Sequence, residues 1–222
     1  MTFHVRKFLL LVTFLLFALI AWLLCIDLGS SVYWRVWHFN NTNISTVWIG
    51  LWKFCYLQWN FELKFELTYP TVICMKINSS WVFPQELKYS QDLITLSIFL
   101  QMIGQIFSFG AFLMIFKNES YPYFIDTCHL IAGCCFIISG ISISISVICN
   151  TYMDITDISA LELPQDFPVK WDTIIYKEIG LAFPMGISSA VCSFISGVFF
   201  FCHSLCSKFS RVHPQDNILN SK

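Results

Sequence analysis

Four long apolar runs dominate the pattern of hydrophobic and polar positions along this chain. Each run lacks Asp, Glu, Lys and Arg, and they cover residues 8–26, 93–116, 130–149 and 179–201. A helix needs about 20 apolar residues to cross a bilayer. The pattern therefore predicts four transmembrane helices. The last run stays uncharged as far as residue 207, and we place its exit from the bilayer near Phe201.

The third run contains "ISISISVIC", an alternation that would indicate a strand in water. An isolated strand in hydrocarbon would leave its backbone groups unpaired, whereas a helix pairs its own. Serine side chains in a helix can also bond back to nearby carbonyls. We therefore predict that this run is helical.

A cleaved signal peptide is the alternative interpretation of the first run. The leader "HVRK" is suitably basic, but the apolar run is longer than the usual signal core of about 7–15 residues. The following "LLCIDLGSS" offers only a weak cleavage site. We therefore predict that the run is retained as a membrane anchor.

Basic residues at the ends of the runs give the predicted orientation. Arg6 and Lys7 precede the first run, while Lys117, Lys208 and Arg211 follow the second and fourth. By the positive-inside rule, this arrangement places both termini in the cytosol. The predicted outer segments are residues 27–92 and 150–178, and the predicted cytosolic segments are residues 117–129 and 202–222.

Glycosylation sequons agree with this orientation. Asn40 in "NNT", Asn43 in "NIS" and Asn78 in "NSS" all fall in the first outer segment and are candidate glycosylation sites. The sequon at Asn118 falls in the inner segment, and we expect it to stay unmodified.

Composition supports a lipid environment. Hydrophobic residues make up 56% of the 222 positions and charged residues only 12%, about half the charged share of a typical soluble domain. We therefore expect a single membrane-embedded domain over residues 1–222. A net charge of −1 gives no electrostatic basis for binding nucleic acid.

The ten cysteines separate by location. Cys55 and Cys74 are the two that lie clearly in the oxidising outer segment, so we predict that they form a disulfide. Cys202 and Cys206 lie at the cytosolic end of the fourth run and are candidate palmitoylation sites. The remainder lie in or beside the spans, where cysteine acts as a small apolar packing residue.

The segment "CYLQWNFELKFEL", residues 55–67, alternates strictly, with apolar residues at the odd positions. This period predicts a strand with one covered face, which could bend partway along its length. The sequence "TVIC" at residues 71–74 follows a Tyr-Pro turn signal and predicts the returning strand. The disulfide would then tie two neighbouring strands.

The order of residues in the first outer segment resembles the claudin family. Trp34 (or Trp37) is followed by Gly50-Leu51-Trp52, and then by Cys55 and Cys74. The stretches "YWRVW", "IGLWKFC", "LKYSQDLI" and "YKEIG" are most similar to the divergent claudin thirty-four group.

This resemblance implies a left-handed four-helix bundle that carries a small antiparallel sheet. Most strands would come from the first outer segment and one from the second. It also implies association with itself or other claudin-like proteins, in cis and in trans, to form a paracellular barrier at tight junctions. Trp34, Gly50, Leu51 and Trp52 would anchor the sheet at the bilayer surface. The segment Phe167, Pro168 and Val169 is a candidate trans contact.

Several departures from the family pattern affect these expectations. The interval between the two cysteines is longer than in most claudins, and Lys88 replaces an arginine usual at the outer end of the second span. Lysine lacks the planar fork of arginine. The tail ends in Lys222, which does not offer the hydrophobic terminal side chain that PDZ domains bind.

Charge patterning favours a barrier over a selective pore. Glu62, Lys64 and Glu66 alternate in sign along one strand face and would largely cancel. The acidic residues of the second outer segment lack the spacing of a calcium loop and are expected to be hydrated: Asp154, Asp157, Glu162, Asp166 and Asp172. The small residues Ser189, Ser193 and Gly197 favour packing within the bundle over dimerisation.

Motifs for catalysis are missing from the sequence: it contains no CxxC, HExxH, GxSxG or P-loop. We therefore expect no enzyme activity, no cofactor and no metal site. The alternative function is a non-junctional tetraspan regulator of another membrane protein or channel. Epithelial membrane proteins and channel-associated gamma subunits, which share the Gly-Leu-Trp and cysteine pattern, act in this way.

Overall fold

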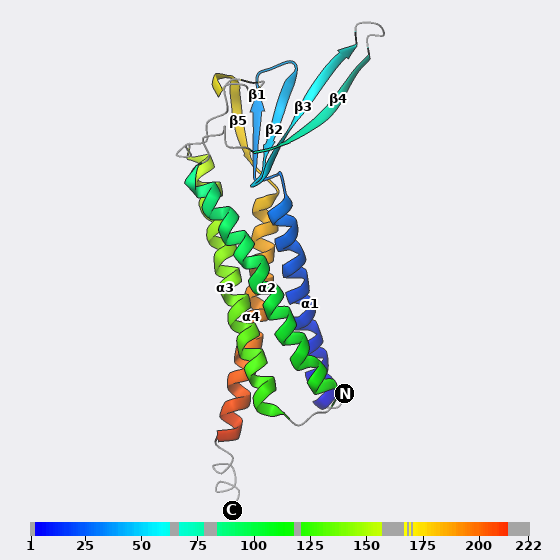
Figure 1. Cartoon of the computed structure of the whole chain (residues 1–222), viewed down its shortest axis with the longest axis vertical. Helices are drawn as coiled ribbons and strands as arrows, with labels where there is room; N and C mark the ends of the chain where they lie inside the picture. The colour runs from blue at the N-terminus through cyan, green and yellow to red at the C-terminus, as the bar shows by residue number, and fades with distance from the viewer. Residues whose placement is uncertain are drawn as a thin grey trace, which may run out of the picture. The chain divides into compact units, whose positions relative to one another are not determined.

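A computed structural model describes residues 3–62, 67–77, 84–117, 121–156, 167, 169 and 171–212. Within these residues, four consecutive strands lie between the first two long helices, and a fifth strand precedes the last helix (Figure 1). The elements in order are α1 (Phe3–Ser30), β1 (Arg35–Phe39), β2 (Ile44–Ile49), β3 (Lys53–Glu62), β4 (Leu67–Lys76), α2 (Gln85–Phe116), α3 (Pro122–Ile155), the 3-10 helix η1 (Trp171–Thr173), β5 (Ile174–Ile179) and α4 (Ala182–Val212).

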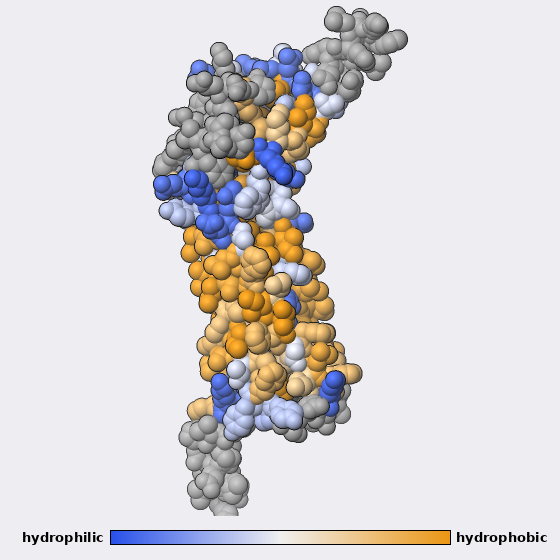
Figure 2. All heavy atoms as spheres, in the orientation of Figure 1, coloured by the Kyte–Doolittle hydropathy of each residue, from blue (hydrophilic) through white to orange (hydrophobic). Residues whose placement is uncertain are grey.

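Each of the helices α1 to α4 is long and apolar enough to cross a membrane. Hydrophobic residues, orange in Figure 2, cover most of the visible surface of these helices. The alternating "ISISISVIC" lies inside α3, so the helical prediction for it is confirmed. The fourth helix begins at Ala182, three residues after the predicted start, because Ile179 ends strand β5 instead.

The chain divides into two compact units. One comprises residues 1–24, 96–142 and 188–222, and the other comprises residues 25–95 and 143–187. The first unit contains only helix among its described elements. The second contains the sheet together with the adjoining ends of the helices.

Helices α3 and α4 approach closely in the helical unit. A Cβ atom added to Gly133 would lie 2.8 Å from the backbone nitrogen of Phe201, and one added to Gly197 would lie 3.0 Å from that of Ile137. Small residues permit this approach, which maximises packing where lipid provides no hydrophobic driving force. An apolar cluster fills the neighbouring space: Leu11, Ala18, Ala132, Phe136 and Phe200.

Buried polar side chains link the helices of this unit. The Gln101 side chain on α2 donates to Ser139 Oγ on α3 at 2.8 Å and to Ser193 Oγ on α4 at 2.9 Å. Ser189 Oγ donates to the Ala21 carbonyl of α1 at 2.8 Å. The row of small residues that includes Ser189, Ser193 and Gly197 therefore packs within the chain, as predicted.

The sheet of the second unit is antiparallel throughout, with the strand order β4-β3-β2-β1-β5. Strands β1 to β4 come from the first predicted outer segment, and β5 comes from the second. Strand β3 ends at Glu62 and Leu67 opens β4, so residues 55–67 do not form one continuous strand. The alternation continues across the reversal, which is why the sequence pattern did not reveal it.

The core of the sheet lies on one face of its central strands. Val47 pairs with both Trp37 and Tyr56, and Ile49 pairs with Phe54, so these side chains share a face. They form a buried apolar cluster together with Phe39, Ile44 and Val169.

This register corrects the predicted covered face of β3. The even-numbered Phe54 and Tyr56 enter the core, whereas the sequence predicted the odd positions. Cys55 is nevertheless buried, and Leu57 and Trp59 are half-buried, so the opposite face is partly covered too. Both faces are apolar at the beginning of this strand, and alternation alone does not show which face meets the core.

Candidate functional site

A disulfide links the two strands at the β4 edge of the sheet. Cys55 on β3 and Cys74 on β4 are register partners with their Cα atoms 4.1 Å apart, and their sulfurs are bonded. The predicted disulfide is therefore confirmed. Closing a loop of 19 residues stabilises the fold by about 3 kcal/mol in the chain-entropy estimate.

Trp34 caps the end of the first helix. Its indole nitrogen donates to the Leu28 carbonyl at 3.0 Å, and its side chain is buried. Because α1 ends at Ser30, this carbonyl is one of the last four, which have no partner within the helix. The tryptophan thus joins the beginning of the sheet to the end of α1 within the same unit.

Gly50 occupies a position that excludes any side chain. A Cβ atom there would collide with the Ser31 carbonyl oxygen and would lie 2.8 Å from the Val32 Cα. Its backbone nitrogen also donates to the Lys53 carbonyl at 2.9 Å, which closes the turn between β2 and β3. Only glycine fits where two backbone segments approach this closely.

The two residues after Gly50 have contrasting environments. Leu51 is fully buried, and its carbonyl accepts a hydrogen bond from the Gln91 side chain at 2.6 Å. Trp52 is 51% exposed. Trp34, Gly50 and Leu51 thus pack inside the chain, while Trp52 presents its ring outward. Contact of Trp52 with the bilayer surface stays a prediction.

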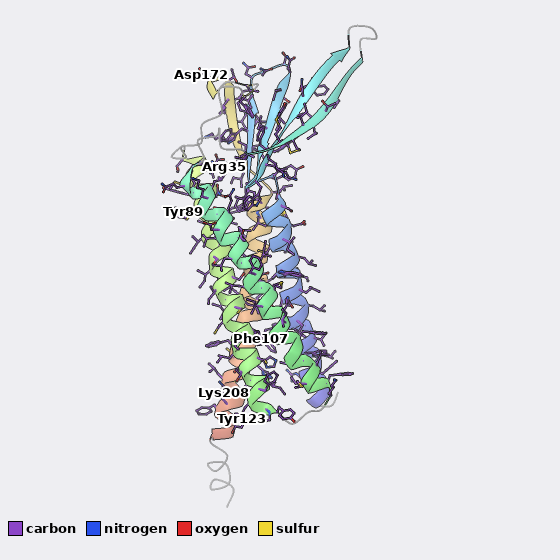
Figure 3. The ribbon with its side chains drawn as sticks, viewed as in Figure 1. Arg35, Tyr89, Phe107, Tyr123, Asp172 and Lys208 are labelled. Atoms are coloured by element: carbon purple, nitrogen blue, oxygen red, sulfur yellow. A yellow bond between two sulfur atoms is a disulfide. The ribbon has the colours of Figure 1, made fainter. Side chains whose placement is uncertain are left out.

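Arg35, which the sequence analysis did not identify, lies at the beginning of β1 (Figure 3). It is 1% exposed, and its Nη2 and Nε atoms donate to Asn150 Oδ1 on α3 at 2.7 and 3.2 Å. Its guanidinium also lies 3.8 Å from a carboxylate oxygen of Glu86 on α2 and of Asp154 on α3. Burial lowers the pKa of Arg35, while the two carboxylates oppose that shift.

Neighbouring hydrogen bonds hold the Arg35 partners in place. Trp37 donates from its indole nitrogen to Asp154 Oδ1 at 3.2 Å, and the Asn150 amide donates to Ser90 Oγ at 3.0 Å. We call Arg35, Trp37, Glu86, Asn150 and Asp154 the arginine cluster. One signal for it was present in the sequence, because Arg35 precedes Trp37 by two positions and therefore shares its strand face.

The arginine cluster corrects one expectation, the hydration of Asp154. Lys88 is exposed on α2, and its replacement of the arginine usual in the family stays a prediction. Asp154 is buried and bonded rather than hydrated, because Arg35 and Trp37 replace its water. Asp172 is exposed, as expected. Three further acidic residues of that segment lie outside the described residues: Asp157, Glu162 and Asp166.

The structure places the remaining predicted site residues as follows. Phe167 packs against the rings of Phe54 and Tyr56, and Val169 is 3% exposed in the sheet core, so little of Val169 is available to a partner. Asn40 and Asn43 are exposed between β1 and β2, and Cys202 and Cys206 are exposed on α4. The predictions that fall outside the described residues concern Lys64, Glu66, Asn78, Asn118, Pro168 and Lys222.

The surface of the sheet is suited to recognition. At the β4 edge, Val72 and Met75 expose apolar surface, and at the opposite edge Ile175 and Tyr176 of β5 do the same. Trp52 exposes its ring in the turn between β2 and β3. Edge strands also carry backbone groups that can pair with another strand. Among the described residues, no group of three or more His, Cys, Asp and Glu side chains could hold a metal ion.

Comparisons with known proteins agree with this geometry. A sequence profile of the family described as "PMP-22/EMP/MP20/Claudin tight junction" matches residues 8–202. Claudin-4 of Chlorocebus aethiops is 26% identical over 141 residues, which cover 61% of this chain and 62% of claudin-4. The match thus spans less than two thirds of the length of that relative.

Proposed function

The chain belongs to the PMP-22/EMP/MP20/claudin family, and on that premise we propose that it is a structural protein of tight junctions. It associates with copies of itself or with other claudin-like proteins, both within one membrane and across a cell contact. These assemblies contribute to a paracellular barrier. Both termini lie in the cytosol, and the sheet lies outside the cell.

The observation that carries this proposal is the disulfide-linked sheet with two apolar edges. Val72 on β4 is 58% exposed and Ile175 on β5 is 61% exposed. Because β4 and β5 are opposite ends of one sheet, each copy offers two different surfaces for neighbours. Contacts between unlike surfaces form rings or open rows rather than closed pairs, and a continuous barrier requires open rows.

Charge supports a barrier in preference to a selective pore. The described side chains on the sheet surface carry both signs, with Lys53 and Lys76 exposed at one end and Glu178 exposed at the other. A selective pore would concentrate one sign of charge around the ion path.

A second candidate function follows from the breadth of the family, whose description names PMP-22, EMP and MP20 beside claudin. In this alternative, the chain is a regulator of another membrane protein. In that case the exposed apolar edges would contact an unrelated channel or receptor instead of a second copy.

Expression in fibroblasts that lack tight junctions separates the two functions. Freeze-fracture imaging should reveal strands at contacts between expressing cells. A variant with Val72→Lys and Ile175→Lys should reach the surface without forming strands, whereas Thr13→Ser, a conservative change on an exposed α1 position, should leave them intact. Diffuse surface staining of the wild type that depends on co-expression of another channel would support the regulator.

A further inference from the structure

The turn between β1 and β2 carries two glycosylation sequons that the proposed function does not use. Asn40 and Asn43 begin adjacent sequons, and both side chains are exposed. The side chain of Asn41 holds the turn, because its Oδ1 accepts hydrogen bonds from the backbone nitrogens of Asn43 at 2.8 Å and Ile44 at 3.3 Å. The turn thus presents two candidate acceptor amides on a defined backbone.

The structure distinguishes the two sequons. The sequon of Asn40 ends at Thr42, which is exposed, and all three residues lie in the turn before β2. The sequon of Asn43 continues into β2, where Ile44 is buried in the core and Ser45 is half-buried. The backbone carbonyl of Asn43 also accepts a hydrogen bond from Trp59 at 2.9 Å. Formation of the sheet therefore withdraws the second sequon and leaves the first accessible.

The compartment required for a glycan is also the one required for the disulfide. Cys55 and Cys74 pair in an oxidising environment, which for a membrane protein is the secretory lumen. The β1–β2 turn belongs to the same connection between α1 and α2 as these cysteines. The turn therefore faces the compartment in which oligosaccharides are attached to asparagine.

We propose that Asn40 is the N-glycosylation site of this turn. The Asn40 side-chain nitrogen forms a bond to C1 of the first sugar of a lipid-linked oligosaccharide. The bond between C1 and the diphosphate oxygen breaks, the lipid diphosphate leaves, and the amide loses one proton.

A glycan at this position would make the two edges of the sheet unequal. The backbone nitrogen of Asn40 donates to the Thr173 carbonyl at 2.7 Å, so the sugar begins beside η1 and the start of β5. Strand β4 lies at the other end of the strand order. The oligosaccharide therefore begins nearer to the β5 edge of the sheet than to the β4 edge.

The test is a glycosidase mobility assay on the full-length protein expressed in mammalian cells. Every chain in the assay carries Asn78→Gln, which removes the third sequon, and the chain with no other change is called wild type here. It is compared, before and after treatment with an N-glycosidase, with Asn40→Gln, Asn43→Gln, Thr42→Ala and Thr42→Ser. We expect one glycan step in wild type, Asn43→Gln and Thr42→Ser, and none in Asn40→Gln and Thr42→Ala.

Thr42→Ala and Thr42→Ser form a matched pair that differs by the hydroxyl alone. A glycan step that persists in Asn40→Gln, or the absence of any step in wild type, would overturn the proposal. Neither outcome depends on whether junction strands form.

Discussion

Arg35 on β1 donates two hydrogen bonds to a single oxygen of Asn150 on α3, at 2.7 and 3.2 Å, although 115 positions separate them in the chain. A buried guanidinium is costly unless its charge and its donors are satisfied. Asn150, Asp154 and Glu86 satisfy them here. The arginine cluster therefore fixes β1 against the ends of α2 and α3 within their common unit.

Replacing Arg35 by lysine should strongly destabilise the protein. Lysine keeps the charge but lacks the fork that reaches Asn150 and both carboxylates together. A buried acceptor that loses its donor in this way costs about 1–3 kcal/mol. Thermal unfolding in detergent should shift to lower temperature, and surface biotinylation should fall. Lys88→Arg, an exchange of the same two residue types at an exposed position, is the control and should change neither.

Gly50→Ala should disrupt the turn between β2 and β3. The added methyl group meets the backbone of Ser31 and Val32, which cannot move away as a side chain would. We expect a loss of about 1–3 kcal/mol and retention in the endoplasmic reticulum, measured by glycosidase sensitivity and confocal microscopy. Gly110→Ala is the matched control, because a Cβ atom there meets nothing within 4 Å. Equal effects of the two variants would contradict the tight approach at Gly50.

The transmembrane helices and the disulfide could be predicted from sequence because each depends on local information. Long uncharged runs have few stable alternatives in lipid, and Cys55 and Cys74 were the two cysteines clearly outside them. The partners of Arg35 could not be predicted, since Glu86, Asn150 and Asp154 come from two other helices. The prediction of which face of β3 is covered was also wrong, because Phe54 and Tyr56 are aromatic and alternate with apolar residues on the other face.

Replacement by leucine should lower thermal stability at Gln101 but not at Gln105. Gln101→Leu removes two hydrogen bonds that link α2 to α3 and α4, worth about 0.6 kcal/mol each in membrane proteins. Within the described part of the chain, the buried Gln105 Nε2 has no hydrogen-bond partner. Gln105→Leu removes that unsatisfied donor and should leave thermal stability unchanged or raised. A lower melting temperature for Gln105→Leu than for Gln101→Leu would show that the polar link is not structural.

Trp34 and Trp52 should differ in how much their replacement by phenylalanine lowers the melting temperature. Trp34→Phe removes the hydrogen bond to the Leu28 carbonyl and leaves that helix-end group buried and unpaired, at a cost of about 1–3 kcal/mol. Trp52→Phe changes a half-exposed side chain and should alter stability little. If both variants unfold at the same temperature as wild type, the capping role assigned to Trp34 is wrong.

The most direct test of the whole account is the redox state and sidedness of Cys55 and Cys74 in intact cells. Thiols are blocked with a permeant alkylating agent, the cells are treated with a membrane-impermeant reductant, and newly exposed thiols are labelled and located by mass spectrometry. An external, disulfide-linked sheet predicts that both cysteines acquire the second label only after the impermeant reductant. Labelling of either cysteine by the first agent, or a requirement for permeabilisation before reduction, would contradict it.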